Sequence, residues 1–212
     1  MTTAMINAAV IYYSATGNVH QMAEAAASAA EKAGAEVRLR RVAELAPESI
    51  IAATPDWARH VEATRDIPTA SPDDLEWADV VLFGTPTRFG QCAAQLKQFI
   101  DTAGPLWLQG KLVNKVGSSF TSSACTHGGQ ESTIIALNNT FYHWGAIIVP
   151  TGWADPVQFD PHNGNPYGAS SVSMETPSNV HGQNLLAVQF QARRTVEIAT
   201  ALKTGLAAMP GR

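Results

Sequence analysis

The sequence predicts an α/β protein of one domain, residues 1–212, in which helices cover both faces of a doubly wound parallel β-sheet. Three observations predict this class. Short apolar runs rich in β-favouring residues alternate with longer helical patterns along the chain. The run at 80–84 is apolar without alternation, as expected of a strand buried on both faces. An apolar content of 45% is enough for a core on each side of the sheet.

The strands and helices follow one another in a regular order. Residues 36–42 alternate in polarity, whereas the other strands are mainly apolar. Gly34 stops the first helix, and Ser71 with Pro72 provides a cap and a first position for another. The predicted strands are 8–13, 36–42, 80–84, 115–121 and 146–150. The predicted helices are 20–33, 56–63, a short one from 72, 93–102, 131–144 and 184–206.

Two segments depart from this regular alternation. Residues 43–70 carry three prolines and are predicted as an irregular excursion around the short helix at 56–63. Residues 151–179 are rich in Gly, Pro, Asn and Ser. Loops of this length are uncommon in compact domains and are often functional.

Composition excludes several classes of protein. The net charge of −4 and the lack of a basic run give nucleic-acid binding no electrostatic support. Cys92 and Cys125 have neither disulfide-framework nor zinc-site spacing, so we expect no metal and a reducing, cytoplasmic location. Residues 1–8 do not read as a signal peptide, and no apolar run reaches the length of a membrane helix, so we expect a soluble protein. A charged fraction of only 15% suggests surface hidden in an oligomer.

In a doubly wound sheet, ligands bind beyond the carboxyl ends of the strands, where the strand order reverses. The loop after the first strand reads Ser14, Ala15, Thr16, Gly17, Asn18 and Val19. It opens a helix, so its N–H groups favour an anion, and its hydroxyls suit a terminal phosphate monoester. It lacks the lysine of a triphosphate-binding loop and the three glycines of a dinucleotide-binding loop. The alternative is an ordinary turn with a polar cap.

Two further loops are expected at the same edge of the sheet. The second reads Thr85, Pro86, Thr87, Arg88, Phe89 and Gly90. Its amides suit the pyrimidine edge of a flat heterocycle, and Arg88 suits the negative charge of a reduced flavin. The third reads Ser122, Ser123, Ala124, Cys125, Thr126, His127, Gly128 and Gly129. We interpret Cys125 as a packing residue rather than a redox thiol, and His127 as a polar loop residue rather than a catalyst. The alternative for the second loop is a surface turn with a solvated arginine.

Together these residues resemble the WrbA family of flavodoxin-like NAD(P)H:quinone oxidoreductases. The resemblance extends over most of the chain, with the motifs in the family's order. The matching motifs are Tyr12-Tyr13-Ser14, Gly84-Thr85-Pro86-Thr87-Arg88-Phe89-Gly90, Gly128-Gly129-Gln130-Glu131, His143 before Gly145, and Asn165-Pro166-Tyr167-Gly168-Ala169.

The resemblance implies a three-layer flavodoxin-like fold of five strands in the order 2-1-3-4-5, with added loop segments, and FMN as cofactor. The family's FMN contacts fall on residues 14–19, 87–89, 123–128 and His143, and its substrate-side tryptophan matches Trp107. We extend the predicted cofactor site to Pro86, Gly90 and Ser122 because they flank these segments. The family assembles as homotetramers whose active sites are lined by neighbouring subunits.

This chain differs from the family pattern at two places. Thr16, which we also assign to the substrate side, stands where the family often has an aromatic residue associated with nicotinamide approach. The third loop is one residue longer than the family's form. The resemblance implies a two-electron, ping-pong reduction of quinones to hydroquinones by NADH or NADPH. The alternatives are a flavodoxin-type electron carrier and a non-catalytic interaction protein of the same fold.

Overall fold

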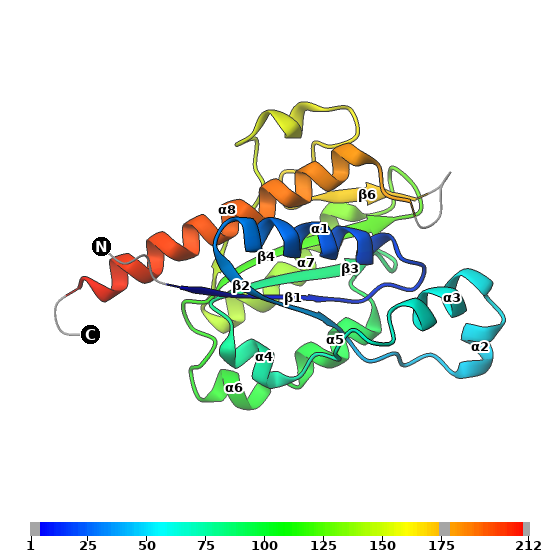
Figure 1. Cartoon of the computed structure of the whole chain (residues 1–212), viewed down its shortest axis with the longest axis horizontal. Helices are drawn as coiled ribbons and strands as arrows, with labels where there is room; N and C mark the ends of the chain where they lie inside the picture. The colour runs from blue at the N-terminus through cyan, green and yellow to red at the C-terminus, as the bar shows by residue number, and fades with distance from the viewer. Residues whose placement is uncertain (1–4, 174–178, 210–212) are drawn as a thin grey trace.

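A parallel β-sheet forms the centre of the protein, which is described here from a computed structural model covering residues 5–173 and 179–209. The sheet order is β2-β1-β3-β4-β5, and a short strand β6 pairs in parallel with β4 (Figure 1). The strands are β1 (Ile6–Tyr12), β2 (Ala35–Arg41), β3 (Val80–Pro86), β4 (Val116–Ser123), β5 (Ile147–Ile148) and β6 (Ser170–Val172).

Helices cover the sheet on both faces, which gives three layers (Figure 1). Helices α1 and α8 lie side by side on one face, and α4, α5, α6 and α7 lie on the other. The helices are α1 (Asn18–Lys32), α2 (Glu48–Ala52), α3 (Pro55–Ala63), α4 (Pro72–Trp77), α5 (Ala94–Asp101), α6 (Gly104–Leu108), α7 (Gln130–Trp144), η1 (Pro156–Phe159) and α8 (Gly182–Ala207).

The apolar runs of the sequence become central strands because both of their faces are covered. In β1, Val10 and Tyr12 pack with α1 and α8, whereas Ile11 packs with α5 and α7 on the opposite face. All three side chains are almost completely excluded from solvent. At about 25 cal/mol per Å² of apolar surface removed from water, this two-sided burial is the main stabilising contribution of the central strands.

The predicted flavodoxin-like sheet order is confirmed, and the structure adds elements that the sequence analysis missed. Strand β6 is a sixth strand, formed inside the stretch that we predicted to be a loop. Strand β5 has two residues instead of the predicted five, because only Val116 and Gly117 of β4 pair with it. Helices α2 and α6, of five residues each, were also missed.

The described part of the segment predicted as the loop 151–179 makes contacts with the sheet and with α8. It holds η1 and β6, and residues 174–178 lie outside the described residues. Ahead of β6, the amide of Ala169 donates to the side chain of Gln191 on α8, and its carbonyl accepts from Thr121 on β4. These bonds hold the segment against the carboxyl end of β4.

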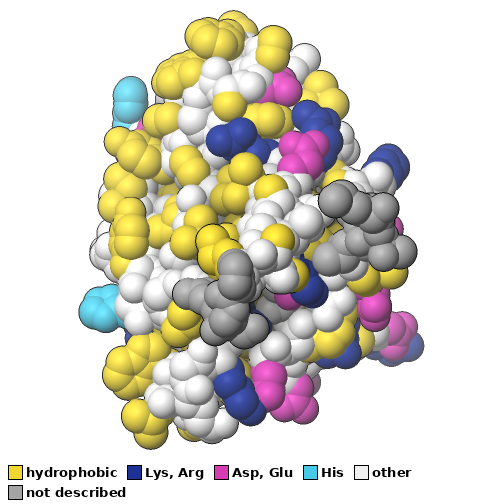
Figure 2. All heavy atoms as spheres, turned by 90° about the vertical axis from the view of Figure 1, so that its left-hand side faces the viewer, with side chains coloured by type: hydrophobic (Ala, Val, Ile, Leu, Met, Phe, Trp, Pro, Cys, Tyr) yellow, Lys and Arg dark blue, Asp and Glu magenta, His cyan; other side chains and the backbone are white. Residues whose placement is uncertain are grey.

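Hydrophobic side chains gather at the upper end of the molecule in Figure 2, over the segment that precedes β6. Trp153 and Phe159 pack ring against ring there, with centroids 5.0 Å apart, and both remain exposed. None of the helices in the described parts of the chain has the length and apolar character needed to cross a bilayer.

Candidate functional site

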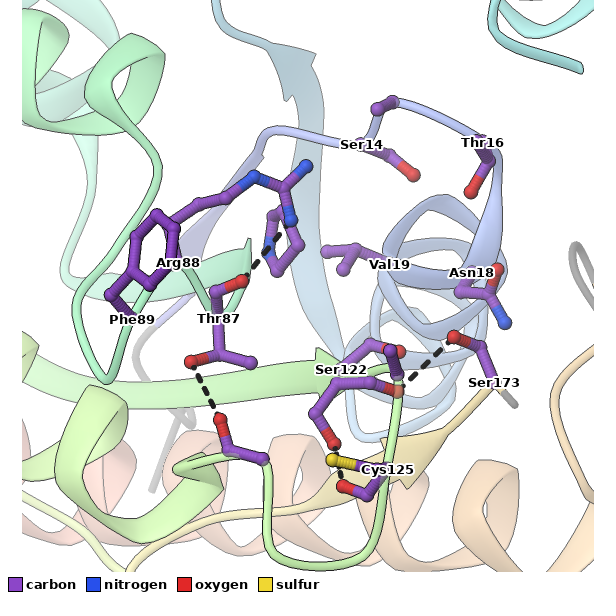
Figure 3. Close-up of a pocket in the computed structure, with 15 residues that line it drawn as sticks. Ser14, Thr16, Asn18, Val19, Thr87, Arg88, Phe89, Ser122, Cys125 and Ser173 are labelled. Carbon is purple, nitrogen blue, oxygen red and sulfur yellow. Dashed lines mark hydrogen bonds between the residues drawn. The ribbon is translucent and has the colours of Figure 1, made fainter.

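The carboxyl ends of β1, β3 and β4 open into one pocket of about 350 Å³. It contains the three loops that the sequence analysis placed at this edge, including Asn18, Arg88 and Gly128. Figure 3 shows side chains from all three loops facing the same space. The residues that line the pocket are Ser14, Ala15, Thr16, Asn18, Val19, Pro86, Thr87, Arg88, Phe89, Ser122, Ser123, Ala124, Cys125, Gly128 and Ser173.

The first loop turns directly into helix α1 at Gly17. This glycine is the N-cap residue and has a φ of 104°, a left-handed conformation that residues with a Cβ rarely adopt. Its N–H donates to Ser14 Oγ over 3.0 Å, which closes the loop. Gly17 has no side chain to cap the helix, and the positive end of the dipole of this 15-residue helix favours an anion at this loop.

The second loop places a cation and an aromatic ring beside the pocket. Arg88 donates from Nη1 to the carbonyl of Thr87 over 3.1 Å, and its backbone pairs with Gln91 in a tight turn. Phe89 has a φ of 53° and a fully exposed ring. Among the described residues that line the pocket, Arg88 alone carries a charge.

The third loop begins later than predicted. Ser122 and Ser123 are the last residues of β4, so the loop proper starts at Ala124. The carbonyl of Cys125 accepts bonds from Ser123 Oγ at 2.7 Å and from the Gly128 amide at 3.0 Å, which curls the loop back on itself. The interpretation of Cys125 as a packing residue was wrong, because the residue is exposed and lines the pocket.

Ser173 lines the pocket and was missed in the sequence. Its amide and hydroxyl both donate to the carbonyl of Ser123, at 2.9 and 3.1 Å (Figure 3). The pairing of β6 with β4 carries it there from a segment that shows no strand pattern. The only sequence signal was the unusual length of the polar stretch around it.

Two of the predicted site residues lie together but away from this pocket. Trp107 on α6 donates from its indole N–H to the carbonyl of His143 on α7, over 2.9 Å. Both line a separate cavity of about 450 Å³ between α5, α6 and α7. Of the other predicted residues, Gly17, Gly90 and His127 lie in the three loops without lining the pocket, and Thr126 lines a neighbouring cavity.

Comparison with known proteins places the chain in a family. The family model of NADPH-dependent FMN reductases matches residues 6–160. The chain belongs to this family.

Relatives of this FMN reductase family protein extend over nearly the whole chain. The NAD(P)H dehydrogenase (quinone) of Deinococcus radiodurans is 44% identical over 205 residues, which cover 94% of this chain and 98% of that protein. The protein of the same name from Aromatoleum aromaticum is 41% identical over 204 residues, with 94% and 98% covered.

Solved structures agree on the fold of this family protein. A WrbA-like flavodoxin protein from Agrobacterium tumefaciens superimposes with a TM-score of 0.64 at 24% identity, covering 92% of this chain and 97% of that one. An archaeal flavodoxin gives a TM-score of 0.57 at 18% identity, covering 93% and 99%.

In this FMN reductase family protein, one carboxylate ties the first two pocket loops to the excursion at 43–70. Glu44 accepts hydrogen bonds from the hydroxyl of Tyr13 at 2.9 Å, the indole of Trp57 at 3.0 Å and the amide of Gln95 at 2.7 Å. Tyr13 precedes the first loop and Gln95 follows the second. Burial pushes the pKa of Glu44 upward, but the bonds from these groups and from the Ala46 amide outweigh it and hold the pKa below 4.5.

The Glu44 carboxylate makes the free energy of unfolding depend on pH under acidic conditions. A pKa that is lower in the folded state means that ionised Glu44 stabilises the fold above about pH 4.5, and that this contribution is lost as the pH falls through the folded value. We expect Glu44→Gln to lower the free energy of unfolding at pH 7 by about 1 kcal/mol, a modest figure because the group is partly exposed. Urea unfolding of both proteins at pH 7 and pH 3.5 measures this, and an unchanged difference at the two pH values would contradict it.

Proposed function

We propose that this protein is an FMN-dependent NAD(P)H:quinone oxidoreductase that reduces quinones to hydroquinones by two electrons in a ping-pong cycle. The observation that carries the proposal is the convergence of three loops on one pocket that is rich in hydroxyls and in which Arg88 is the one cationic side chain among the described lining residues. The names of the full-length relatives, at 41–44% identity, support the same activity and its use of NADH or NADPH.

The residues around the pocket fit FMN. The hydroxyls of Ser14 and Thr16 and the N-terminus of α1 suit a terminal phosphate held by hydrogen bonds rather than by lysine. The hydroxyls of Ser122, Ser123 and Ser173 lie where they suit a polyol chain. We assign all the predicted residues of the three loops to this cofactor site, with Thr16 also facing the nicotinamide.

When bound, FMN would supply the hydride-transfer chemistry between the nicotinamide and the quinone. The protein contributes position and electrostatics. Thr87, Arg88 and Phe89 lie side by side at the second loop, where they orient a flat ring and stabilise negative charge on it. The pocket holds no other charged side chain among the residues described, so Arg88 provides the electrostatic stabilisation.

We further propose that the protein works as a homotetramer in which the Trp107 and His143 surface of one protomer closes the pocket of another. The proposal is supported by the large apolar side chains that this surface exposes and by the low charged fraction of the chain, 15%. Trp107 is 53% exposed, Leu108 81% and Tyr142 71%. Sedimentation velocity measures the assembly, and a monomer at micromolar concentration would contradict the proposal.

We also propose that the chain forms a single domain and acts in the cytoplasm. Helices α1, α4, α5, α6, α7 and α8 all pack on the one sheet, which supports the first point. Cys92 and Cys125 are both free thiols, which suits a reducing compartment. Partial proteolysis and cell fractionation test the two statements.

Steady-state kinetics of the FMN-loaded protein test the proposed activity. We expect oxidation of NADH or NADPH that requires added benzoquinone and produces one hydroquinone for each nicotinamide consumed. Parallel lines in double-reciprocal plots would support the ping-pong order. Tight FMN binding without turnover would favour an electron carrier, and no FMN binding would favour a non-catalytic protein.

A further inference from the structure

The hydroxyl groups of two threonines join the second and third pocket loops to a buried side chain of helix α7. Thr133 on α7 donates from Oγ1 to Thr87 Oγ1 over 2.7 Å. Thr87 in turn donates from Oγ1 to the carbonyl of Gly128 over 3.3 Å. Thr87 and Gly128 line the pocket from opposite loops, whereas Thr133 lies behind them with no exposed surface.

The hydrogen bond made by Thr133 is unusual for a threonine inside a helix. Such side chains commonly donate to the carbonyl four residues earlier or point to solvent. Thr195 on α8 behaves in that way and donates to the carbonyl of Gln191 over 2.7 Å. Thr133 instead donates to a residue 46 positions away, so its hydroxyl acts between elements rather than within its own helix.

The second and third loops are close enough for the hydrogen bonds from Thr133 to Thr87 and from Thr87 to Gly128, here called the threonine relay, to set their separation. A Cβ built on Gly129 would lie 3.1 Å from Cα of Gly90, so the two backbones touch at one end. Near the pocket, the amide of Thr87 donates to the carbonyl of Ser122 over 2.8 Å. Between these contacts, the threonine relay fixes the rotamer of Thr87 through two hydrogen bonds, one accepted from Thr133 and one donated to the Gly128 carbonyl.

We propose that Thr133 is a positioning residue for the flavin, because its hydroxyl proton fixes Thr87 and thereby the width of the slot between the second and third loops. This inference rests on the proposed function. Without the Thr133 hydroxyl, Thr87 loses one of the two bonds that fix its rotamer, so its remaining bond to the Gly128 carbonyl of the third loop is less firmly oriented. The bound ring then sits in a wider and less ordered slot.

The test is FMN titration of four proteins, followed by fluorescence quenching and by the absorption spectrum of the bound flavin. Thr133→Val removes the hydroxyl at nearly constant volume, and we expect the Kd for FMN to rise about fivefold, as for the loss of one hydrogen bond. Thr133→Ser keeps the hydroxyl and should stay within about twofold of the unchanged protein. Thr195→Val is the matched control, since Thr195 is equally buried but lies outside the pocket.

The outcomes separate positioning from general stability. A weakened T133V, a restored T133S and an unaffected T195V, with an altered flavin spectrum only in T133V, would support the role. An unchanged Kd in T133V, equal losses in T133V and T195V, or no restoration by T133S would each overturn it. A T133V protein that does not fold while T133S binds FMN normally would also overturn it, since the hydroxyl would then be structural.

Hydrogen–deuterium exchange without FMN separates this inference from the proposed function. The Gly128 amide is hydrogen-bonded to the carbonyl of Cys125 within the third loop. We expect peptides covering 124–129 to exchange faster in T133V than in the unchanged protein, and at the same rate in T195V. Equal exchange in all three proteins would overturn the inference even if FMN binds, whereas failure of the unchanged protein to bind FMN would refute the proposed function.

Discussion

Replacing Gly168 by alanine is expected to lower the free energy of unfolding by about 3 kcal/mol, at the upper end for overpacking a tightly packed site. A Cβ at this position would lie 2.1 Å from the carbonyl oxygen of Ser119 on β4 and 3.2 Å from the side chain of Gln191 on α8. The first of these atoms is backbone in a central strand and cannot move away cheaply. The segment before β6 must therefore shift outward, which breaks the bonds of Ala169 to both elements.

The Gly168→Ala substitution should also change the pocket wall. Because β6 carries Ser173 to the pocket wall, we expect FMN affinity to fall together with stability. Urea unfolding and FMN titration measure the two effects. Gly205→Ala is the matched control, because in the described parts of the chain no atom beyond its chain neighbours and its own helix backbone lies within 4 Å of its Cβ position. Alanine should be stabilising there by about 0.5–1 kcal/mol. Equal stability of G168A and G205A would contradict this account of the contact.

The central fold could be predicted from the sequence because its elements have strong local patterns. The run at 80–84 is apolar on both faces, and the structure buries it between two helical layers as β3. The loop at 14–19 could likewise be predicted to face a ligand, because N–H groups at the start of a helix favour an anion, and the structure places most of its residues in the pocket lining. The three-loop pocket then follows from topology, since the strands run parallel.

The missed parts of the pocket depend on contacts between distant segments. Strand β6 is three residues of Ser and Val that become a strand only by pairing with β4, and Ser173 reaches the pocket through it. Thr133 looks like any helical threonine until Thr87 is placed opposite its hydroxyl. The separation of Trp107 and His143 from the pocket also depends on where α6 and α7 pack. Local propensity carries no information about such pairings.

Arg88→Ala is expected to make the midpoint potential of the bound flavin more negative by about 30 mV, which for two electrons corresponds to about 1.4 kcal/mol. The side chain is exposed, and among the residues that the structure describes it donates to the neighbouring carbonyl of Thr87 alone. No carboxylate in the described parts of the chain forms an ion pair with it, so its charge is available to a ligand. Two opposite unit charges about 4 Å apart gain about 1 kcal/mol in water and more where water is excluded, so negative charge on a ring held beside Arg88 would be stabilised.

Arg88→Lys separates the charge of this residue from its shape. Lysine keeps the positive charge but cannot offer the planar fork that donates to the Thr87 carbonyl, so most of the potential should be retained while FMN affinity falls. Spectroelectrochemical titration gives the potentials, and FMN titration at low and high salt gives the affinities. An exposed charge is screened by salt. If the pocket stays open to solvent, the difference in FMN affinity between R88A and the unchanged protein should therefore become smaller as ionic strength rises. A difference in FMN affinity that stays the same at high salt would instead mean that the Arg88 charge is shielded from solvent, as expected if a second protomer closes the pocket. Equal potentials in all three proteins would remove Arg88 from the electrostatics of the site.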